Sequence, residues 1–167
     1  ARPGSRRWQV HPLMEEELFL IRSRGARVPP LPAAMALADL AGEPLILPTS
    51  PHGLRRTLDA VFARARLAPH LVLEVDSLSV VMAAVDAGLG STVQPWAAMG
   101  RFTDAQQRFE WSRITDGDVR RTNLLCSLSE DELSPAGLAA RVVLLDCVRR
   151  LVNDGAWHGV TPIHYEN

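Results

Sequence analysis

The sequence predicts an α/β fold built on a parallel, doubly wound sheet. Between residues 43 and 95, apolar runs typical of buried strands alternate with segments whose apolar residues recur at helical spacing. The order strand, helix, strand, helix, strand is typical of parallel sheets that carry helices on both faces. A length of 167 residues fits one domain or two small lobes.

Each element of this alternation has its own signal. Ser50 followed by Pro51 is typical of a helix N-cap with proline at the first helical position, so we expect a helix from about Pro51 to Leu67. Ser77 is expected to cap the second helix and Gly88 to end it, because glycine readily adopts a left-handed conformation there. The expected elements are strands at 44–47, 70–75 and 91–95 and helices at 51–67 and 78–87.

The flanking segments predict further elements of both kinds. The first 22 residues indicate two short strands around a turn, and a short helix is expected to end near Gly42. Two more strands are expected at 108–114 and 120–129, separated by a turn at 115–118. Ser134 followed by Pro135 predicts a helix to about Val152. Its apolar stripe of Leu138, Val142, Leu145 and Val148 is expected to face the core.

Composition excludes several classes of function. The formal net charge is only −1, which disfavours a nucleic-acid-binding surface on this chain, and Lys is absent, so all 18 basic residues are Arg. No apolar run approaches the ~18 residues that a membrane span needs, and the start lacks a signal-peptide pattern. Cys126 and Cys147 lie in apolar stretches and are expected to be buried, reduced thiols of a cytoplasmic protein, with a disulfide as the alternative.

The motifs of common catalytic and metal sites are missing. The stretch “GLGSTV” at 88–93 follows a helix and precedes a strand, so it predicts a tight turn and no dinucleotide site. Without lysine there is no nucleoside-triphosphate loop. We therefore expect no catalytic residues, no cofactor and no metal ion. The histidines are too scattered for metal-ligand spacing: His11, His52, His70, His158 and His164.

Polar residues follow all three parallel strands at the point where each strand ends. In doubly wound sheets, ligands bind outside the carboxyl ends of the strands, and a helix start at Ser50 would offer free N–H groups to a carboxylate. The alternative is that Ser50 and Ser77 only cap their helices, which contributes about 1 kcal/mol each. His52 is either a ligand contact or a solvent-facing residue. The candidate binding residues are Thr49, Ser50, Pro51, His52, Gly53, Asp76, Ser77, Thr92 and Gln94.

Four segments carry a resemblance to a known family. In chain order they are “EEELFLI”, “DLAGEPLILPTSPHGLRRTLDAVFARARL”, “LEVDSLSVVMAAVDAGLGSTVQP” and “LSPAGLAARVVLLDCVRRLV”. Their order and spacing, from about Val10 to Trp157, resemble the effector-binding (substrate-binding) domain of LysR-type transcriptional regulators. The resemblance implies a two-lobe, periplasmic-binding-protein type II-like fold with one complete doubly wound lobe plus part of the other. Its implied divisions are partial lobe I at 1–42 and 119–152, lobe II at 43–118, and a C-terminal tail at 153–167.

The resemblance also implies a function. The chain would be the ligand-sensing and dimerisation domain of a regulator, with a small effector, a carboxylate or similar anion, in the cleft between the lobes. It would form a homodimer or tetramer through the 51–67 helix, and would reach DNA only through a helix-turn-helix domain absent from this sequence, without contacting a membrane. The alternatives are a periplasmic solute-binding protein of a transporter and an α/β enzyme.

Overall fold

The computed structural model describes residues 8–25 and 29–163, which divide into two compact units. One unit comprises residues 17–121, and the other comprises the described residues up to 16 and from 122 onward. Strands β1 (Trp8–Ser23) and β7 (Arg120–Leu128) each run from one unit into the other. This division differs from the one implied by the family resemblance, because residues 17–42 and 119–121 belong with 43–118, and the tail belongs with the smaller unit.

The larger unit contains the three predicted parallel strands, of which β3 (Pro44–Leu47) and β4 (His70–Glu74) form a two-stranded sheet and β5 (Thr92–Pro95) belongs to a second sheet joined to it by a single bridge. β3 pairs in parallel with β4. The parallel bridge from Leu45 to Ser91 joins β3 to the segment that leads into β5. β1 pairs antiparallel with β5 and with β6 (Phe109–Ile114), and β2 (Ala34–Met35) pairs in parallel with β6.

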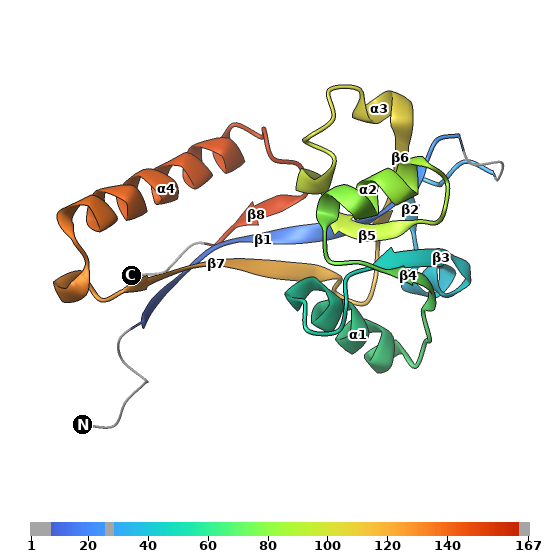
Figure 1. Ribbon diagram of the computed structural model, residues 1–167, viewed down its shortest axis with the longest axis horizontal. Coiled ribbons are helices and arrows are strands. Elements are labelled where there is room, and N and C mark those ends of the chain that lie inside the picture. The colour runs from blue at the N-terminus through green and yellow to red at the C-terminus, as the bar shows by residue number, and fades with distance from the viewer. Residues whose placement is uncertain (1–7, 26–28, 164–167) are drawn as a thin grey trace. The chain divides into compact units, whose positions relative to one another are not determined.

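Helices α1 (Gly53–Ala65) and α2 (Leu78–Asp86) cover opposite faces of these strands (Figure 1). Because side chains alternate between the two faces of a strand, Leu45 and Leu47 belong to the same apolar cluster as residues of α1. Ile46, between them, packs in a second cluster with residues of α2. The doubly wound arrangement predicted from the alternation is therefore confirmed, and each face has its own core.

The remaining elements are short apart from one long helix. They are the 3-10 helices η1 (Leu37–Gly42), η2 (Trp96–Ala98) and η3 (Glu130–Glu132), helices α3 (Ala105–Arg108) and α4 (Pro135–Asn153), and strand β8 (Val160–Pro162). The prediction of two short strands in the first 22 residues was wrong, because β1 continues through His11 and Pro12 without a turn. Strand β8 was not predicted.

The three predicted helix starts differ in outcome. Ser134 caps α4 as predicted, because its Oγ accepts a hydrogen bond from the Gly137 N–H at 3.1 Å. Ser77 occupies the N-cap position of α2, but its hydroxyl makes no capping bond. The predicted cap at Ser50 with Pro51 at the first helical position was wrong. Both residues lie in a turn closed by the His52 N–H to the Thr49 carbonyl at 3.0 Å, and α1 begins two residues later than predicted.

The smaller unit buries few of its described side chains. Only Met14 and Glu16 are buried there, and no residue of α4 is. The apolar stripe predicted for α4 is therefore not buried in a core: Leu138, Leu145 and Val148 are half-buried, and Val142 is 61% exposed. The prediction of buried cysteines was wrong, since Cys126 is exposed and Cys147 half-buried, both as free thiols. In both cases the described part of this unit supplies no packed layer over these residues.

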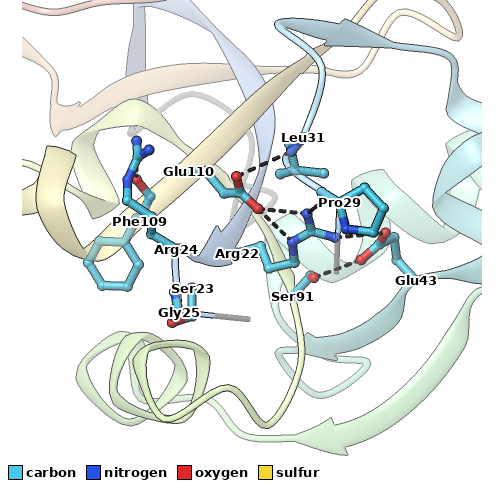
Figure 2. A network of polar contacts seen from close by, with 10 residues as sticks. All are labelled: Arg22, Ser23, Arg24, Gly25, Pro29, Leu31, Glu43, Ser91, Phe109 and Glu110. Atoms are coloured by element: carbon cyan, nitrogen blue, oxygen red, sulfur yellow. Dashed lines mark hydrogen bonds and ion pairs between the residues drawn. The ribbon is translucent and has the colours of Figure 1, made fainter. Parts of the chain in front are cut away.

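A largely buried ionic network, shown in Figure 2, joins the larger unit across its sheet. Arg22 of β1 donates from Nε and Nη2 to one carboxylate oxygen of Glu110 in β6, at 2.9 and 2.6 Å. The other Glu110 oxygen accepts from the Leu31 N–H at 3.2 Å. Arg22 also lies 3.6 Å from Glu43, which accepts a hydrogen bond from Ser91 at 2.8 Å. The network thus joins the residues that precede β3 and β5 to β1 and β6.

The turn between α2 and β5 needs glycine at two positions for different reasons. Gly88 has φ of +75°, so it provides the left-handed conformation that ends α2. At Gly90 a Cβ would lie 2.6 Å from the Pro44 carbonyl oxygen and 3.1 Å from Ile46 Cγ1, so only glycine allows β3 to approach this closely. The predicted reading of “GLGSTV” as a helix-to-strand turn is confirmed.

Candidate ligand-binding site

The carboxyl ends of β3, β4 and β5 bring polar residues to one edge of the parallel sheet. Thr49, two residues beyond β3, donates its backbone N–H to Asp76 Oδ1 at 2.9 Å. Its hydroxyl donates to the same carboxylate at 2.9 and 3.0 Å. Asp76 lies two residues beyond β4. Two strand ends are therefore linked by their own side chains, as the parallel topology predicts.

These contacts favour the ionised form of Asp76. The pKa of its carboxyl is lowered, chiefly because the Thr49 backbone N–H donates to it and also because the Thr49 hydroxyl does. The nearby His52 side chain also lowers this pKa, whereas desolvation of the carboxyl raises it. The carboxylate thus provides a fixed negative charge at this edge of the sheet.

His52 is both the cap of α1 and part of the site. Its Nδ1 accepts a hydrogen bond from the Leu54 N–H at 3.2 Å, which satisfies one of the free donors at the helix start. Because Nδ1 is the acceptor, the neutral imidazole carries its proton on Nε2. His52 can therefore stabilise the helix with one nitrogen and still offer a hydrogen-bond donor from the other.

The two predicted site residues of β5 have different surroundings. Thr92 is fully buried, and its hydroxyl donates to the Ile46 carbonyl at 2.7 Å, so it links β5 to β3. Gln94 is only 5% exposed and lies at the end of β5. Thr92 and Gln94 are two residues apart on the strand, so they point to the same side. The Thr92 hydroxyl bonds to the neighbouring strand, whereas Gln94, near the end of β5, lines the pocket described next.

A pocket of about 200 Å³ lies at this edge, wholly within the larger unit. We refer to it as the strand-edge pocket. It combines apolar walls with an amide, an imidazole, a carboxylate and a guanidinium, so it offers hydrogen-bond donors as well as an acceptor. The pocket is lined by Pro48, His52, Asp76, Leu78, Val81, Gln94, Pro95, Ala97, Ala98 and Arg121.

The structure brings three of the nine predicted binding residues to this pocket, namely His52, Asp76 and Gln94. Thr49 lies behind them and holds Asp76. The other five do not line it. Ser50 and Pro51 form the exposed turn, Gly53 begins α1, Ser77 is exposed at the N-cap of α2, and Thr92 is buried in the sheet.

Arg121 is the cation of the strand-edge pocket, and sequence reasoning missed it. It belongs to β7, which begins just after the turn at 115–118, where Gly117 and Asp118 have positive φ. The predicted turn at 115–118 was the signal that could have identified it, because a chain that reverses there can return to the edge where the strands end.

The described residues contain no group of three or more His, Cys, Asp or Glu side chains that could hold a metal ion. Within the same described segments, none of the helices has the length and apolar character to cross a membrane.

Comparison with known proteins identifies a family. The model of the LysR substrate binding domain matches residues 1–149. Similar curated proteins are the nitrogen assimilation regulatory protein nac of Klebsiella aerogenes, 28% identical over 139 residues, and that of Escherichia coli strain K12, 27% identical over 136 residues. These alignments cover 83% and 81% of this chain but 44% and 43% of the relatives. The chain thus spans less than half the length of these relatives.

Solved structures agree on the fold. The CcmR regulatory domain from Synechocystis PCC6803 in complex with 2-PG has a TM-score of 0.74 and 17% identity, covering 90% of this chain and 72% of that one. The effector-binding domain of QuiR in complex with shikimate has a TM-score of 0.70 and 22% identity, covering 86% and 66%. The predicted periplasmic-binding-protein type II-like fold is therefore confirmed.

Proposed function

The chain belongs to the family of LysR substrate-binding domains, and from that premise we propose that it is the ligand-sensing and dimerisation domain of a DNA-binding transcriptional regulator. Membership of this family favours a regulator over a solute-binding protein of a transporter. The strand-edge pocket is the proposed effector site. Such a regulator acts in the cytoplasm, and it contacts DNA through a helix-turn-helix domain that the relatives' extra length can accommodate.

The observation that carries the proposal is the set of donors that converge on this pocket. His52 offers its Nε2–H and Gln94 its buried amide, and the guanidinium of Arg121 adds a positive charge to the lining. Asp76 accepts hydrogen bonds from Thr49 but retains acceptor capacity on its two oxygens. These two donors and the positive charge of Arg121, beside one carboxylate, favour a small hydroxylated or otherwise polar anion, with its carboxylate toward the donors and a hydroxyl toward Asp76.

The composition of the pocket favours binding over catalysis. Its described lining includes no Ser, Thr, Cys or Lys that could act as a nucleophile. Two of the structural neighbours are complexes with small molecules, shikimate and 2-PG. We therefore propose a sensor with no enzymatic activity, whose effector shifts the equilibrium between two arrangements of the regulator.

The smaller unit is proposed to be the partial first lobe. Its long helix α4 buries no residue, and Val142, Val143, Leu144 and Leu151 are each 46–61% exposed. A stable domain covers such a surface with a second layer. In the proposed regulator, further residues of the first lobe supply that layer.

Assembly is proposed as a homodimer or tetramer. The apolar stripe of α1, made of Leu54, Leu58, Val61 and Phe62, is buried in the chain's own core. A partner that contacts α1 therefore meets its other face, and the stripe itself is not the interface. Sedimentation velocity of the full-length protein tests the oligomeric state.

A thermal-shift titration of the full-length protein with small carboxylates and their matching amides tests the effector site. A ligand at 100 times its Kd stabilises the native state by about 2.7 kcal/mol, which is a shift of several degrees in Tm. We expect a carboxylate to raise Tm in the parent and in Ser50→Ala, where Ser50 is exposed outside the pocket. Gln94→Met, which keeps the side-chain volume, should lose most of the shift. If Gln94→Met responds like Ser50→Ala, the site assignment is wrong.

A further inference from the structure

A second pocket of about 370 Å³ lies on α2, in the same unit as the strand-edge pocket. We call it the α2–α3 pocket, because α2, the loop that carries Arg101 and Phe102, and Arg108 at the end of α3 line it. Its volume falls within the range of about 300–1,000 Å³ that ligand pockets have. Neither the family resemblance nor the proposed effector site accounts for it.

The floor of this pocket is apolar. Met82 is 1% exposed, and Leu78 and Phe102 pack against the same apolar cluster. Phe102 is held in place from two sides, since its ring lies edge-on to Phe109 with centroids 5.1 Å apart and the Arg108 guanidinium lies 4.5 Å above it. A fixed aromatic wall beside aliphatic side chains suits the flat apolar body of a small ligand.

One of the two guanidinium groups at the rim is already neutralised. Arg108 donates to both carboxylate oxygens of Asp86, at 2.6 and 3.2 Å, and lies 3.6 Å from Asp104. The hydrogen bond from Arg108 lowers the pKa of Asp86, so this pair remains charged on both sides. The Arg108 charge is thus used within the protein and serves mainly to fix the wall.

The other guanidinium keeps its charge available. Arg101 donates from Nη1 to the Ser79 hydroxyl at 2.7 Å, and no described residue gives it a carboxylate partner. A guanidinium has five N–H donors, so a neutral hydroxyl leaves most of them open. The pocket's three charged groups are Arg101, Arg108 and Asp86, which sum to one positive charge. An apolar floor under a single unpaired cation matches a monoanion with an apolar body.

We propose that the α2–α3 pocket is a second ligand site, which binds a small aromatic or similarly flat apolar carboxylate. The carboxylate pairs with Arg101 in a two-pronged hydrogen-bonded contact, and the ring lies against Met82 and Phe102. Leu78 lines this pocket as well as the strand-edge pocket, so both ligands contact the same helix. The second site is therefore placed to modulate the first.

Ligand-observed ¹⁹F NMR of the full-length protein with 4-fluorobenzoate tests the proposal, because it detects weak binding to a large protein. Arg101→Gln removes the unpaired charge from an exposed side chain, and Arg56→Gln on α1 is the matched control. Ala83→Leu fills the pocket from an exposed helical position that favours leucine. Uncharged 4-fluorobenzamide tests the role of the carboxylate.

The expected result is saturable binding of 4-fluorobenzoate that Arg56→Gln leaves unchanged. Arg101→Gln and the use of 4-fluorobenzamide should each weaken it at least about fivefold, and Ala83→Leu should abolish it. Binding that is lost only in Gln94→Met would place the probe in the strand-edge pocket, which overturns this proposal and supports the effector site. Absence of saturable binding, or equal binding by Arg101→Gln and the parent, also overturns it.

Discussion

Neutralising Glu110 is expected to unfold the larger unit at much lower denaturant concentration. The Arg22 and Glu110 side chains are only 11% and 14% exposed. Glu110→Gln keeps the volume but removes the charge that accepts two hydrogen bonds from Arg22 and one from Leu31. Removing one member of a buried pair costs about 3–5 kcal/mol. Because Arg22 keeps the Pro29 carbonyl at 2.6 Å as an acceptor, we expect the lower end, about 3 kcal/mol.

Urea denaturation followed by far-UV circular dichroism measures this loss. With a slope of about 2 kcal/mol per molar, the midpoint should fall by about 1.5 M. Asp146→Asn is the control, because its partner Arg150 lies 3.0 Å away but both side chains are more than half exposed, and such pairs contribute at most about 1 kcal/mol. The double variant Arg22→Met, Glu110→Leu should be more stable than Glu110→Gln, since no unpaired charge remains buried. If Glu110→Gln and Asp146→Asn lower the urea midpoint equally, the Arg22–Glu110 pair contributes no more than an exposed ion pair, and the prediction is wrong.

Three further outcomes follow from the turn and the site. Gly90→Ala should lower stability by about 1–3 kcal/mol in a thermal melt, because its Cβ would overlap a backbone carbonyl, whereas Gly42→Ala, with open space around it, should change little; equal shifts would contradict the close approach. His52→Ala should cost about 1 kcal/mol in urea denaturation by uncapping α1, and His52→Asn should recover part of that loss; if the two variants are equally stable, the cap contributes nothing. Asp76→Asn should reduce the pH dependence of stability. Thr49 lowers the folded-state pKa of Asp76, so the carboxylate's contribution is present above the unfolded value of about 3.9 and lost as the pH falls through the folded pKa. In plots of the free energy of unfolding against pH, the parent and Asp76→Asn should therefore differ in slope only below about pH 4. Identical slopes in that range would refute this linkage.

The fold could be predicted where local signals and packing agree. Strand and helix periodicities between residues 43 and 95 predicted the doubly wound sheet, because Leu45 and Leu47 do face one helix and Ile46 the other. Proline misled twice in the same way. Pro12 lies within a strand that continues through it, where two strands around a turn were predicted, and Pro51 precedes the helix that it was predicted to begin. A proline is compatible with several extended and turn conformations, and tertiary contacts choose among them.

The site was predicted at the level of the sheet edge but not of the individual side chain. Thr49 and Asp76 each follow the end of a parallel strand, and this position in the sequence was sufficient to predict that they lie close together. Thr92 and Gln94 are two residues apart on β5, yet one bonds to the sheet and the other lines the pocket, a difference that depends on the neighbouring backbone. Arg121 comes from a distant segment, so no spacing in the sequence linked it to the others.

Helix α2 forms a wall common to two pockets, and this sharing has a thermodynamic consequence. Leu78 lines both pockets. A ligand in one pocket that selects one rotamer of Leu78 therefore also sets the shape of the other pocket. Free-energy coupling between two binding equilibria is reciprocal: the factor by which the first ligand alters the affinity for the second equals the factor in the opposite direction. Substitution of Leu78 should change that factor while leaving the polar contacts of each pocket intact. A double titration before and after Leu78→Ala would therefore measure how strongly one helix turn links the two equilibria.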